Sequence, residues 1–296
     1  MKEDLGKSFK MLRESKGLSQ KEIASDIISI AQLSRFERGI SSINAETLYN
    51  CLENMNVSVE EFQCVCRDFL QSQNAIFQND VAKAFLEKNT LKLREYLAKY
   101  QSLASIAPGQ KFYRLNTIII KSVLYQCDDF DKVSKKDIQF LVDYLFSVEE
   151  WGRYELWLFT YSAALMTNNL VEIFASEMIN RTQFYQEIPE NRRLVNQMLF
   201  NVIIICVERN RFSLAFKLLN YADNLKREET DLFTRNAVKY CRGYYLCKRG
   251  NLSGLTIMEK CTEIMIFLEC YTIAQQMSDR LTKLKQEKSY LQKEIT

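Results

Sequence analysis

The chain is 296 residues long, 47% of its residues are apolar, and its formal net charge is +3. Such a length and composition can fill the core of one large domain or of two ordinary ones. The sequence contains no histidine, no GxGxxG motif and no P-loop. Because histidine is the commonest general base and metal ligand, these absences argue against an enzyme, and we expect neither a cofactor nor a metal site.

The composition predicts an all-α fold. Only two prolines and eight glycines occur, so few positions would interrupt a helix. The most apolar stretch, 198–207, contains Asn201 and is too short to cross a bilayer, and no signal-peptide pattern opens the chain. We therefore expect a soluble, cytoplasmic protein with no membrane partner.

Nine cysteines lie mostly among apolar neighbours, and none forms a CxxC pair. This pattern is typical of reduced core cysteines in a cytosolic protein. The close pair Cys64 and Cys66 leaves a redox role open as an alternative to ordinary helix packing.

Residues 1–66 have the pattern of a compact helical domain. We expect five short helices there, at 4–15, 20–27, 30–38, 45–55 and 59–66. Three S-x-x-E/Q capping boxes mark helix starts, at Ser19 with Glu22, Ser29 with Gln32, and Ser58 with Glu61. Gly17 and Gly39 stand where helices commonly end in a left-handed conformation.

The second and third of these helices have the pattern of a helix-turn-helix. Its second helix enters the major groove of DNA, where its N-terminal side chains read base edges while flanking groups bind phosphates. We expect Gln32 and Arg35 to read bases, because glutamine pairs well with adenine and arginine with guanine. The expected backbone contacts are Arg13, Gln20, Ser29, Ser34 and Arg38.

Two alternatives stay open for this surface. The side chains could form a merely solvated helix face, and Glu37 could hold Arg13 or Arg35 in a structural ion pair. Residues 1–66 carry eight Lys or Arg against ten Asp or Glu. Since this charge balance gives little affinity for phosphates, we expect DNA binding to require two copies of the domain.

The turn between the two helices is short. Ala24 and Ser34 are ten residues apart, one fewer than is usual, and this spacing, together with the run from Gln32 to Gly39, resembles the Rgg branch of the Cro/repressor (XRE) helix-turn-helix regulators. Rgg regulators often carry Lys-Ser before the glutamine, where this chain has Ile30 and Ala31. That departure implies a shifted operator preference.

The rest of the chain has a repeat pattern. We expect a helical linker at 67–79 and a repeat domain at 80–296. Short polar turns recur about every 40 residues, and each is followed by an apolar residue that opens a helix, at Leu91, Phe130, Leu170, Phe212 and Leu252. We therefore expect TPR-like helical hairpins that stack into a right-handed superhelix with a concave groove, and HEAT-like pairs remain an alternative.

The chain ends in a helix with an apolar face, formed by Leu281, Leu284, Leu291 and Ile295. We expect it to cap the stack or to pack on a partner protomer.

Concave helical arrays bind extended peptides, whose amides pair with Asn, Gln and Arg side chains. The candidate peptide contacts are Asn116, Arg153, Tyr161, Gln197, Asn201, Arg235 and Asn236. Asn201 interrupts an apolar stretch, so it is either a peptide contact or an inter-helix hydrogen bond. Arg153 is either a peptide contact or part of a surface ion pair with Glu150 or Glu155.

The resemblance to Rgg regulators implies a cytosolic homodimer whose repeat domain binds a short, re-imported pheromone peptide and thereby alters transcription. It also implies that 151–158 and the helix of Asn201 line the peptide. Two rivals remain. One is a constitutive DNA-binding regulator whose repeat domain recruits a protein without a peptide effector, and the other is an enzyme that uses Asp128 and Asp129.

Overall fold

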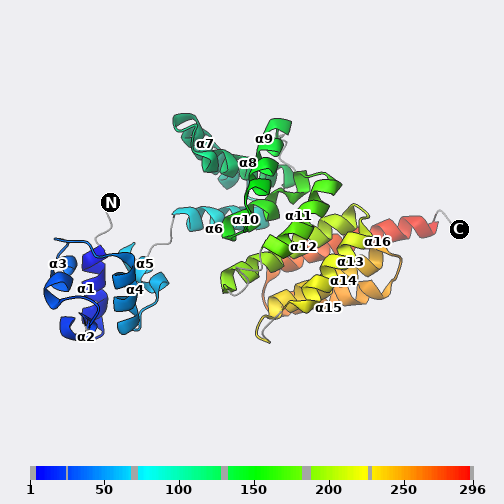
Figure 1. The fold of residues 1–296 in the computed structure, drawn as a ribbon. Helices are drawn as coiled ribbons and strands as arrows, with labels where there is room; N and C mark the ends of the chain where they lie inside the picture. The colour runs from blue at the N-terminus through cyan, green and yellow to red at the C-terminus, as the bar shows by residue number, and fades with distance from the viewer. Residues whose placement is uncertain are drawn as a thin grey trace. The chain divides into compact units, whose positions relative to one another are not determined.

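A computed structural model describes residues 5–24, 26–67, 73–127, 133–181, 188–225 and 229–293, without the side chains of 189, 190 and 288–293. Every regular element in these ranges is a helix, which confirms the predicted all-α fold (Figure 1). The chain divides into two compact units, Met1–Asp80 and Val81–Thr296. Each unit is described by itself below.

The described part of the first unit begins with five short helices. Their bounds are α1 (Leu5–Ser15), α2 (Gln20–Ala24), α3 (Ile30–Glu37), α4 (Ala45–Asn54) and α5 (Val59–Cys66). Four of them agree with the expected ranges to within one residue at each end, whereas α2 ends at Ala24, earlier than expected. The core is centred on Phe9, whose ring meets Phe36 and Phe62 edge-on at centroid distances of 5.5 and 6.4 Å.

Helix ends in this unit follow the sequence signals. Gly17 and Gly39 have positive φ angles of 68° and 70°, the left-handed conformation that glycine adopts without strain. The boxes at Ser19 and Ser58 form completely. In each box the serine hydroxyl accepts from the backbone amide of the glutamate, and the glutamate carboxylate accepts from the backbone amide of the serine. At Ser29 only half of the box forms, because its hydroxyl accepts from the amide of Gln32 and nothing returns.

Gly6 lets α1 approach α3 at backbone distance. A Cβ at this position would lie 1.9 Å from the carbonyl oxygen of Phe36. No side chain fits there, so the position of α3 against α1 depends on this glycine.

Within the described ranges eleven further α-helices follow, with a short 3-10 helix (Ala163–Leu165) between α10 and α11, and α6 crosses the division between the units. Their bounds are α6 (Gln73–Leu86), α7 (Thr90–Ile106), α8 (Lys111–Gln126), α9 (Lys135–Ser147), α10 (Arg153–Ser162), α11 (Asn168–Arg181), α12 (Pro189–Glu208), α13 (Phe212–Asn224), α14 (Leu232–Lys248), α15 (Ser253–Phe267) and α16 (Tyr271–Lys293). Four of the five predicted helix openings fall within two residues of the starts of α7, α11, α13 and α15. The fifth, Phe130, lies outside the described residues.

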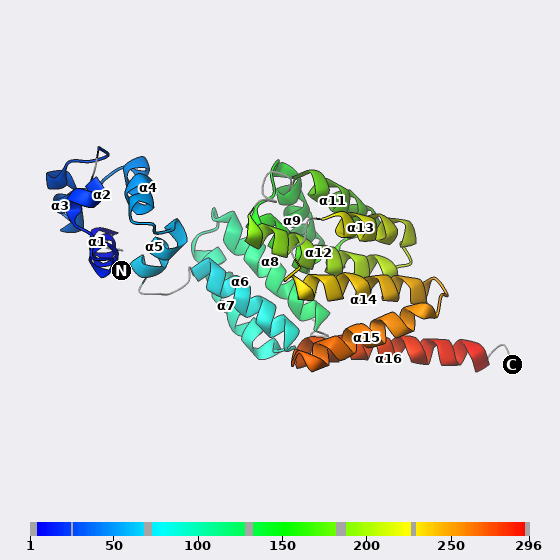
Figure 2. The same ribbon diagram turned by 90° about the horizontal axis from the view of Figure 1, so that it is seen from below.

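The alternate helices α8, α10, α12 and α14 lie side by side, as expected for stacked hairpins. Helix α10 packs between α8 and α12, and α12 also packs against α14, as Figure 2 shows. Helix α16 ends the stack against α15, with Leu281 and Leu284 buried as expected. The side chain of Leu291 and all of Ile295 lie outside the described residues.

Two glycines face each other where α14 crosses α15. A Cβ on Gly254 would lie 2.2 Å from the carbonyl oxygen of Gly243, and one on Gly243 would lie 2.8 Å from the carbonyl oxygen of Gly254. The backbones of α14 and α15 therefore touch directly at these two glycines.

All nine cysteines are free thiols. Five of them are buried, and burial raises the pKa of Cys206 and Cys261 to about 11 and that of Cys241 to about 12. Since the thiolate is the reactive form, these three side chains behave as core residues at neutral pH. Of the close pair, Cys64 is exposed and Cys66 is half-buried.

None of the helices within the described ranges combines the length and the apolar character that a membrane span requires.

Candidate DNA interface and candidate peptide face

The outward face of α3 carries the side chains expected to read bases. Gln32 and Arg35 are exposed, and neither side chain has a hydrogen-bonding partner among the described residues. Arg38, just after the helix, is also exposed and donates from Nε to the carbonyl oxygen of Ser34 at 3.2 Å. Because only half of the capping box forms, the side-chain amide of Gln32 is left without a partner among the described residues, so this face presents unused donors.

Behind this face lies a buried cluster centred on Glu37, which is 2% exposed. Its carboxylate accepts from Arg13 Nε at 2.6 Å, from Arg13 Nη2 at 2.9 Å, and from Gln20 Nε2 at 2.8 Å. Arg13 also donates to the carbonyl oxygen of Leu18 at 2.7 Å. Hydrogen bonding to Glu37 raises the pKa of the Arg13 guanidinium, which therefore stays protonated. The cluster ties α1 and α2 to the last turn of α3.

This geometry changes the expected role of two residues. Arg13 is 6% exposed, and its guanidinium donates hydrogen bonds to Glu37 and to the carbonyl oxygen of Leu18. We therefore assign it a structural role in place of a phosphate contact. The same holds for the side-chain amide of Gln20, whose nitrogen is bound to Glu37. Of the two ion-pair partners that the sequence allowed for Glu37, the fold selects Arg13 and leaves Arg35 outward.

The remaining backbone candidates, Ser29 and Ser34, lie on the same helix. Ser29 is exposed and its hydroxyl caps the helix, while Ser34 is half-buried. The geometry thus gathers Gln32, Arg35 and Arg38 on one accessible face with these serines at its edge.

The seven candidate peptide residues fall into two groups. Asn116, Tyr161 and Asn236 are only 5%, 4% and 6% exposed, and each joins two helices. The Oδ1 atom of Asn116 accepts from the hydroxyl of Tyr154 at 2.9 Å, and the amide of Asn236 donates to the carbonyl oxygen of Cys261 at 2.9 Å. These two asparagines hold α8 to α10 and α14 to α15, so we assign them to inter-helix packing in place of peptide contact.

The other group is accessible. Arg153 and Arg235 are exposed, and Gln197 and Asn201 are half-buried on one face of α12. Glu155 accepts from the Tyr144 hydroxyl at 2.6 Å and from a backbone amide, and it makes no ion pair with Arg153. Asn201 has no hydrogen-bonding partner within the described part of the chain, which favours a ligand contact over the inter-helix bond.

Four helices, one of them α12 with Asn201, are joined by a closed circuit of contacts. Gln197 donates to the hydroxyl of Tyr161 on α10 at 3.2 Å, and Glu208, further along α12, accepts from Arg280 on α16 at 3.4 Å. Gln276, one turn before Arg280, donates to the carbonyl oxygen of Leu86, the last residue of α6, at 3.2 Å. The circuit closes where the ring of Phe85 on α6 meets the ring of Tyr161 edge-on, at a centroid distance of 5.9 Å. We call it the α6–α10–α12–α16 circuit.

Tyr161 is a peptide candidate from the sequence, but the aromatic row on α10 to which it belongs was not predicted. Tyr154, Trp157 and Tyr161 recur at intervals of three and four, and their rings follow one another at centroid distances of 6.0 and 5.9 Å. Burial raises the pKa of Tyr161 to about 12, so its hydroxyl stays neutral. The helical spacing was visible in the sequence, but aromatic residues at that spacing are ordinary core.

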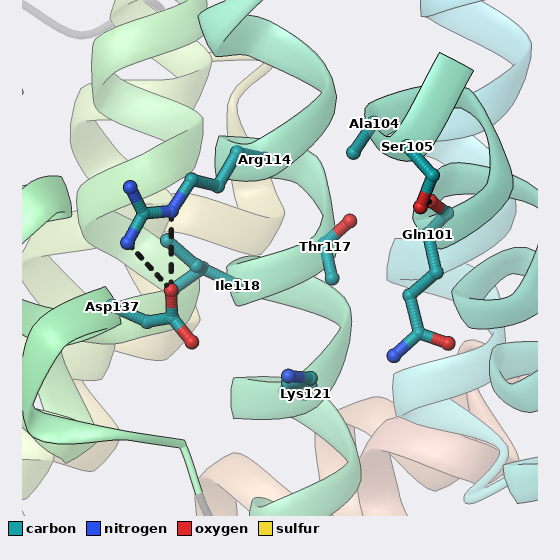
Figure 3. A pocket seen from close by; sticks show the side chains of 8 residues that line it. All are labelled: Gln101, Ala104, Ser105, Arg114, Thr117, Ile118, Lys121 and Asp137. Atoms are coloured by element: carbon teal, nitrogen blue, oxygen red, sulfur yellow. Dashed lines mark hydrogen bonds and ion pairs between the residues drawn. The ribbon is translucent and has the colours of Figure 1, made fainter. Parts of the chain in front are cut away.

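A separate pocket of about 370 Å³ opens between α7, α8 and α9 (Figure 3). Arg114 donates from Nε and Nη2 to the same oxygen of Asp137, at 3.2 and 2.9 Å, and Lys121 lies further along α8. None of the seven candidate peptide residues lines it. The lining residues are Gln101, Ala104, Ser105, Arg114, Thr117, Ile118, Lys121 and Asp137. The carboxylates of the enzyme rival, Asp128 and Asp129, lie outside the described residues.

A three-dimensional helix-turn-helix with an accessible α3, followed by a stack of helical hairpins, defines a DNA-binding transcriptional regulator. Residues 9–62 match the helix-turn-helix family model, and residues 92–279 match the C-terminal domain of the HTH-type transcriptional regulator Rgg. The second match covers more than half of the chain, and the protein belongs to the Rgg family. This is a family of transcriptional regulators and not of enzymes.

Solved structures of similar fold cover nearly the whole chain. The SHP pheromone receptor Rgg2 of Streptococcus dysgalactiae is 27% identical, with a TM-score of 0.79 over 94% of this chain and 99% of that one. A putative transcriptional regulator from Listeria monocytogenes EGD-e is 19% identical, with a TM-score of 0.83 over 98% and 99% of the two chains. The PrgX/cCF10 complex is 14% identical, with a TM-score of 0.70 over 95% and 92%. The last two show a common fold.

Proposed function

We propose that this Rgg-family regulator is a cytoplasmic homodimer that binds promoter DNA through α3 and is controlled by a short signalling peptide. The observation that carries the peptide assignment is the half-buried Asn201, which has no hydrogen-bonding partner among the described residues and lies one helical turn after Gln197, a member of the α6–α10–α12–α16 circuit. The likeness to Rgg2, whose structure is that of a pheromone receptor, supports it.

The proposed mechanism consists of binding steps and involves no chemical reaction. Two copies place their α3 helices in the major groove at half-sites about one DNA turn apart. A peptide that binds one arrangement of the repeat unit better than another shifts the population between them by its differential affinity. The contacts proposed for the peptide are Arg153, Gln197, Asn201 and Arg235. The contacts proposed for DNA are Gln32 and Arg35 on bases, with Ser29, Ser34 and Arg38 on the backbone.

Arg35→Ala is expected to relax base preference at one position of each half-site by about 1–3 kcal/mol, because a bidentate arginine–guanine contact is lost. Competition binding with duplexes that vary one position at a time measures this change. Arg38→Ala is the matched control and should weaken binding to all sequences by a similar factor. An equal loss for every sequence with Arg35→Ala would contradict the assignment of Arg35 to a base.

The peptide proposal is tested by capture and titration. The purified chain is incubated with culture medium, the bound peptide is identified by mass spectrometry, and a synthetic copy is titrated by calorimetry. Asn201→Ala should weaken binding about three- to tenfold, as expected for one or two lost hydrogen bonds. Asn220→Ala, on the exposed face of α13, should leave affinity unchanged.

A constitutive regulator that only recruits a protein would give a different result. No peptide would be captured, and DNA binding would be the same with and without culture medium. Sedimentation of the purified chain tests the homodimer directly, and a single monomeric species at micromolar concentration would exclude it.

A further inference from the structure

The first turn of α3 is apolar on its surface. Ile30, the first residue of the helix, is 47% exposed, and Ala31 beside it is exposed as well. The hydroxyl of Ser29, the preceding residue, already accepts from a backbone amide. The N-terminal end of α3 therefore exposes the methyl groups of Ile30 and Ala31, and the exposed polar side chains of the helix begin at Gln32.

The fold does not account for Ile30. The core face of α3 is formed by Leu33 and Phe36, with Glu37 in the buried ion pair, and all three are at most 5% exposed. Isoleucine is not a favoured residue at a solvated helix start, because its branched side chain gains nothing there from packing. An exposed, apolar first turn is therefore explained better by what the helix contacts than by what it packs on.

The chemistry of the major groove narrows the contact. The N-terminal residues of the recognition helix meet base edges in a helix-turn-helix. All four bases present polar atoms there, O4 in the case of thymine, and a hydrocarbon that covers such atoms leaves them without partners. Thymine alone presents a methyl group, which an apolar side chain removes from water with a gain in free energy.

We propose that Ile30, with Ala31 beside it, selects thymine in each half-site through contact with the thymine methyl group. This inference rests on DNA binding by α3 and adds the identity of a base to it. Arg35 lies one helical turn beyond Ala31, so a guanine contacted by Arg35 should follow the thymine at a fixed spacing within the half-site.

The experiment uses the full chain. Preferred duplexes are first selected from a random pool, and each thymine of the half-site is then replaced by deoxyuridine, which lacks only the methyl group. At one or two positions the wild-type protein should lose about three- to fivefold in affinity, the effect of one methyl group removed from an apolar contact. Ile30→Ala should bind thymine and deoxyuridine duplexes equally well, and Ile30→Val should keep part of the difference.

Arg35→Ala serves as the control and should keep the deoxyuridine penalty while losing guanine preference. Tolerance of deoxyuridine at every position would overturn the inference, as would an unchanged penalty in Ile30→Ala, which would leave Ile30 as a surface for another protein. If the wild-type chain selects no duplex at all, DNA binding by α3 fails and the inference fails with it.

Discussion

Replacing Glu37 with alanine is expected to destabilise the helix-turn-helix unit by about 3–5 kcal/mol and to abolish DNA binding. The change leaves the guanidinium of Arg13 buried and without its charge partner, and removal of one member of a buried ion pair has a cost of this size. Hydrogen exchange of amides in α1 to α5, followed by mass spectrometry, measures the loss in this unit separately from the rest of the chain.

Glu14→Ala is the matched control. Glu14 also reaches Arg13, at 3.5 Å, but its side chain is 56% exposed, so its loss should change stability by less than about 1 kcal/mol. A double variant, Arg13→Met with Glu37→Met, should recover part of the loss, because no unpaired charge remains. Equal effects of Glu14→Ala and Glu37→Ala would show that the buried pair does not hold α3 in place.

The second large effect is expected at the crossing of α14 and α15. Gly254→Ala places a Cβ 2.2 Å from the carbonyl oxygen of Gly243 and 2.7 Å from Sγ of Cys247, so the two helices must move apart. We expect a loss of about 2–3 kcal/mol, typical of overpacking, and a fall in the unfolding temperature of about 4–12 °C. Thermal unfolding followed by circular dichroism measures this shift.

Gly109→Ala provides the comparison within the same unit. A Cβ at Gly109 would have no heavy atom within 4 Å and the backbone there is not left-handed, so the change should be neutral or slightly stabilising. If Gly254→Ala melted at the wild-type temperature, the close approach of the two backbones would be wrong.

The helix-turn-helix could be predicted largely from local signals. The capping boxes at Ser19 and Ser58 mark helix starts, and Gly17 and Gly39 mark helix ends. Both boxes form, and both glycines adopt the left-handed conformation, as expected. The early end of α2 after Ala24 was not predicted, because the helical pattern continues past it. Local signals define ends where a side chain or a positive φ acts on its own neighbours.

The buried contacts required the tertiary structure. Glu37 could pair with Arg13 or Arg35 on the sequence alone, and only the packing of α1 on α3 selects between them. The contact of Gly254 with Gly243 has no local signature, because a glycine looks the same in a loose turn and at a helix crossing. Among the candidate peptide contacts, the sequence offers no reason to separate Asn116 from Asn201. In the structure Asn116 accepts a hydrogen bond from Tyr154, whereas Asn201 has no partner among the described residues.

The contact between Gln276 and the end of α6 joins residues 190 positions apart, so the first and last helices of the second unit meet. An open array of repeats frays from its ends and gains or loses units with little consequence, since each repeat depends only on its neighbours. A stack whose first and last helices touch has less freedom at its ends than an open array, so we expect α6 and α16 to fray less readily than the terminal helices of an open repeat protein.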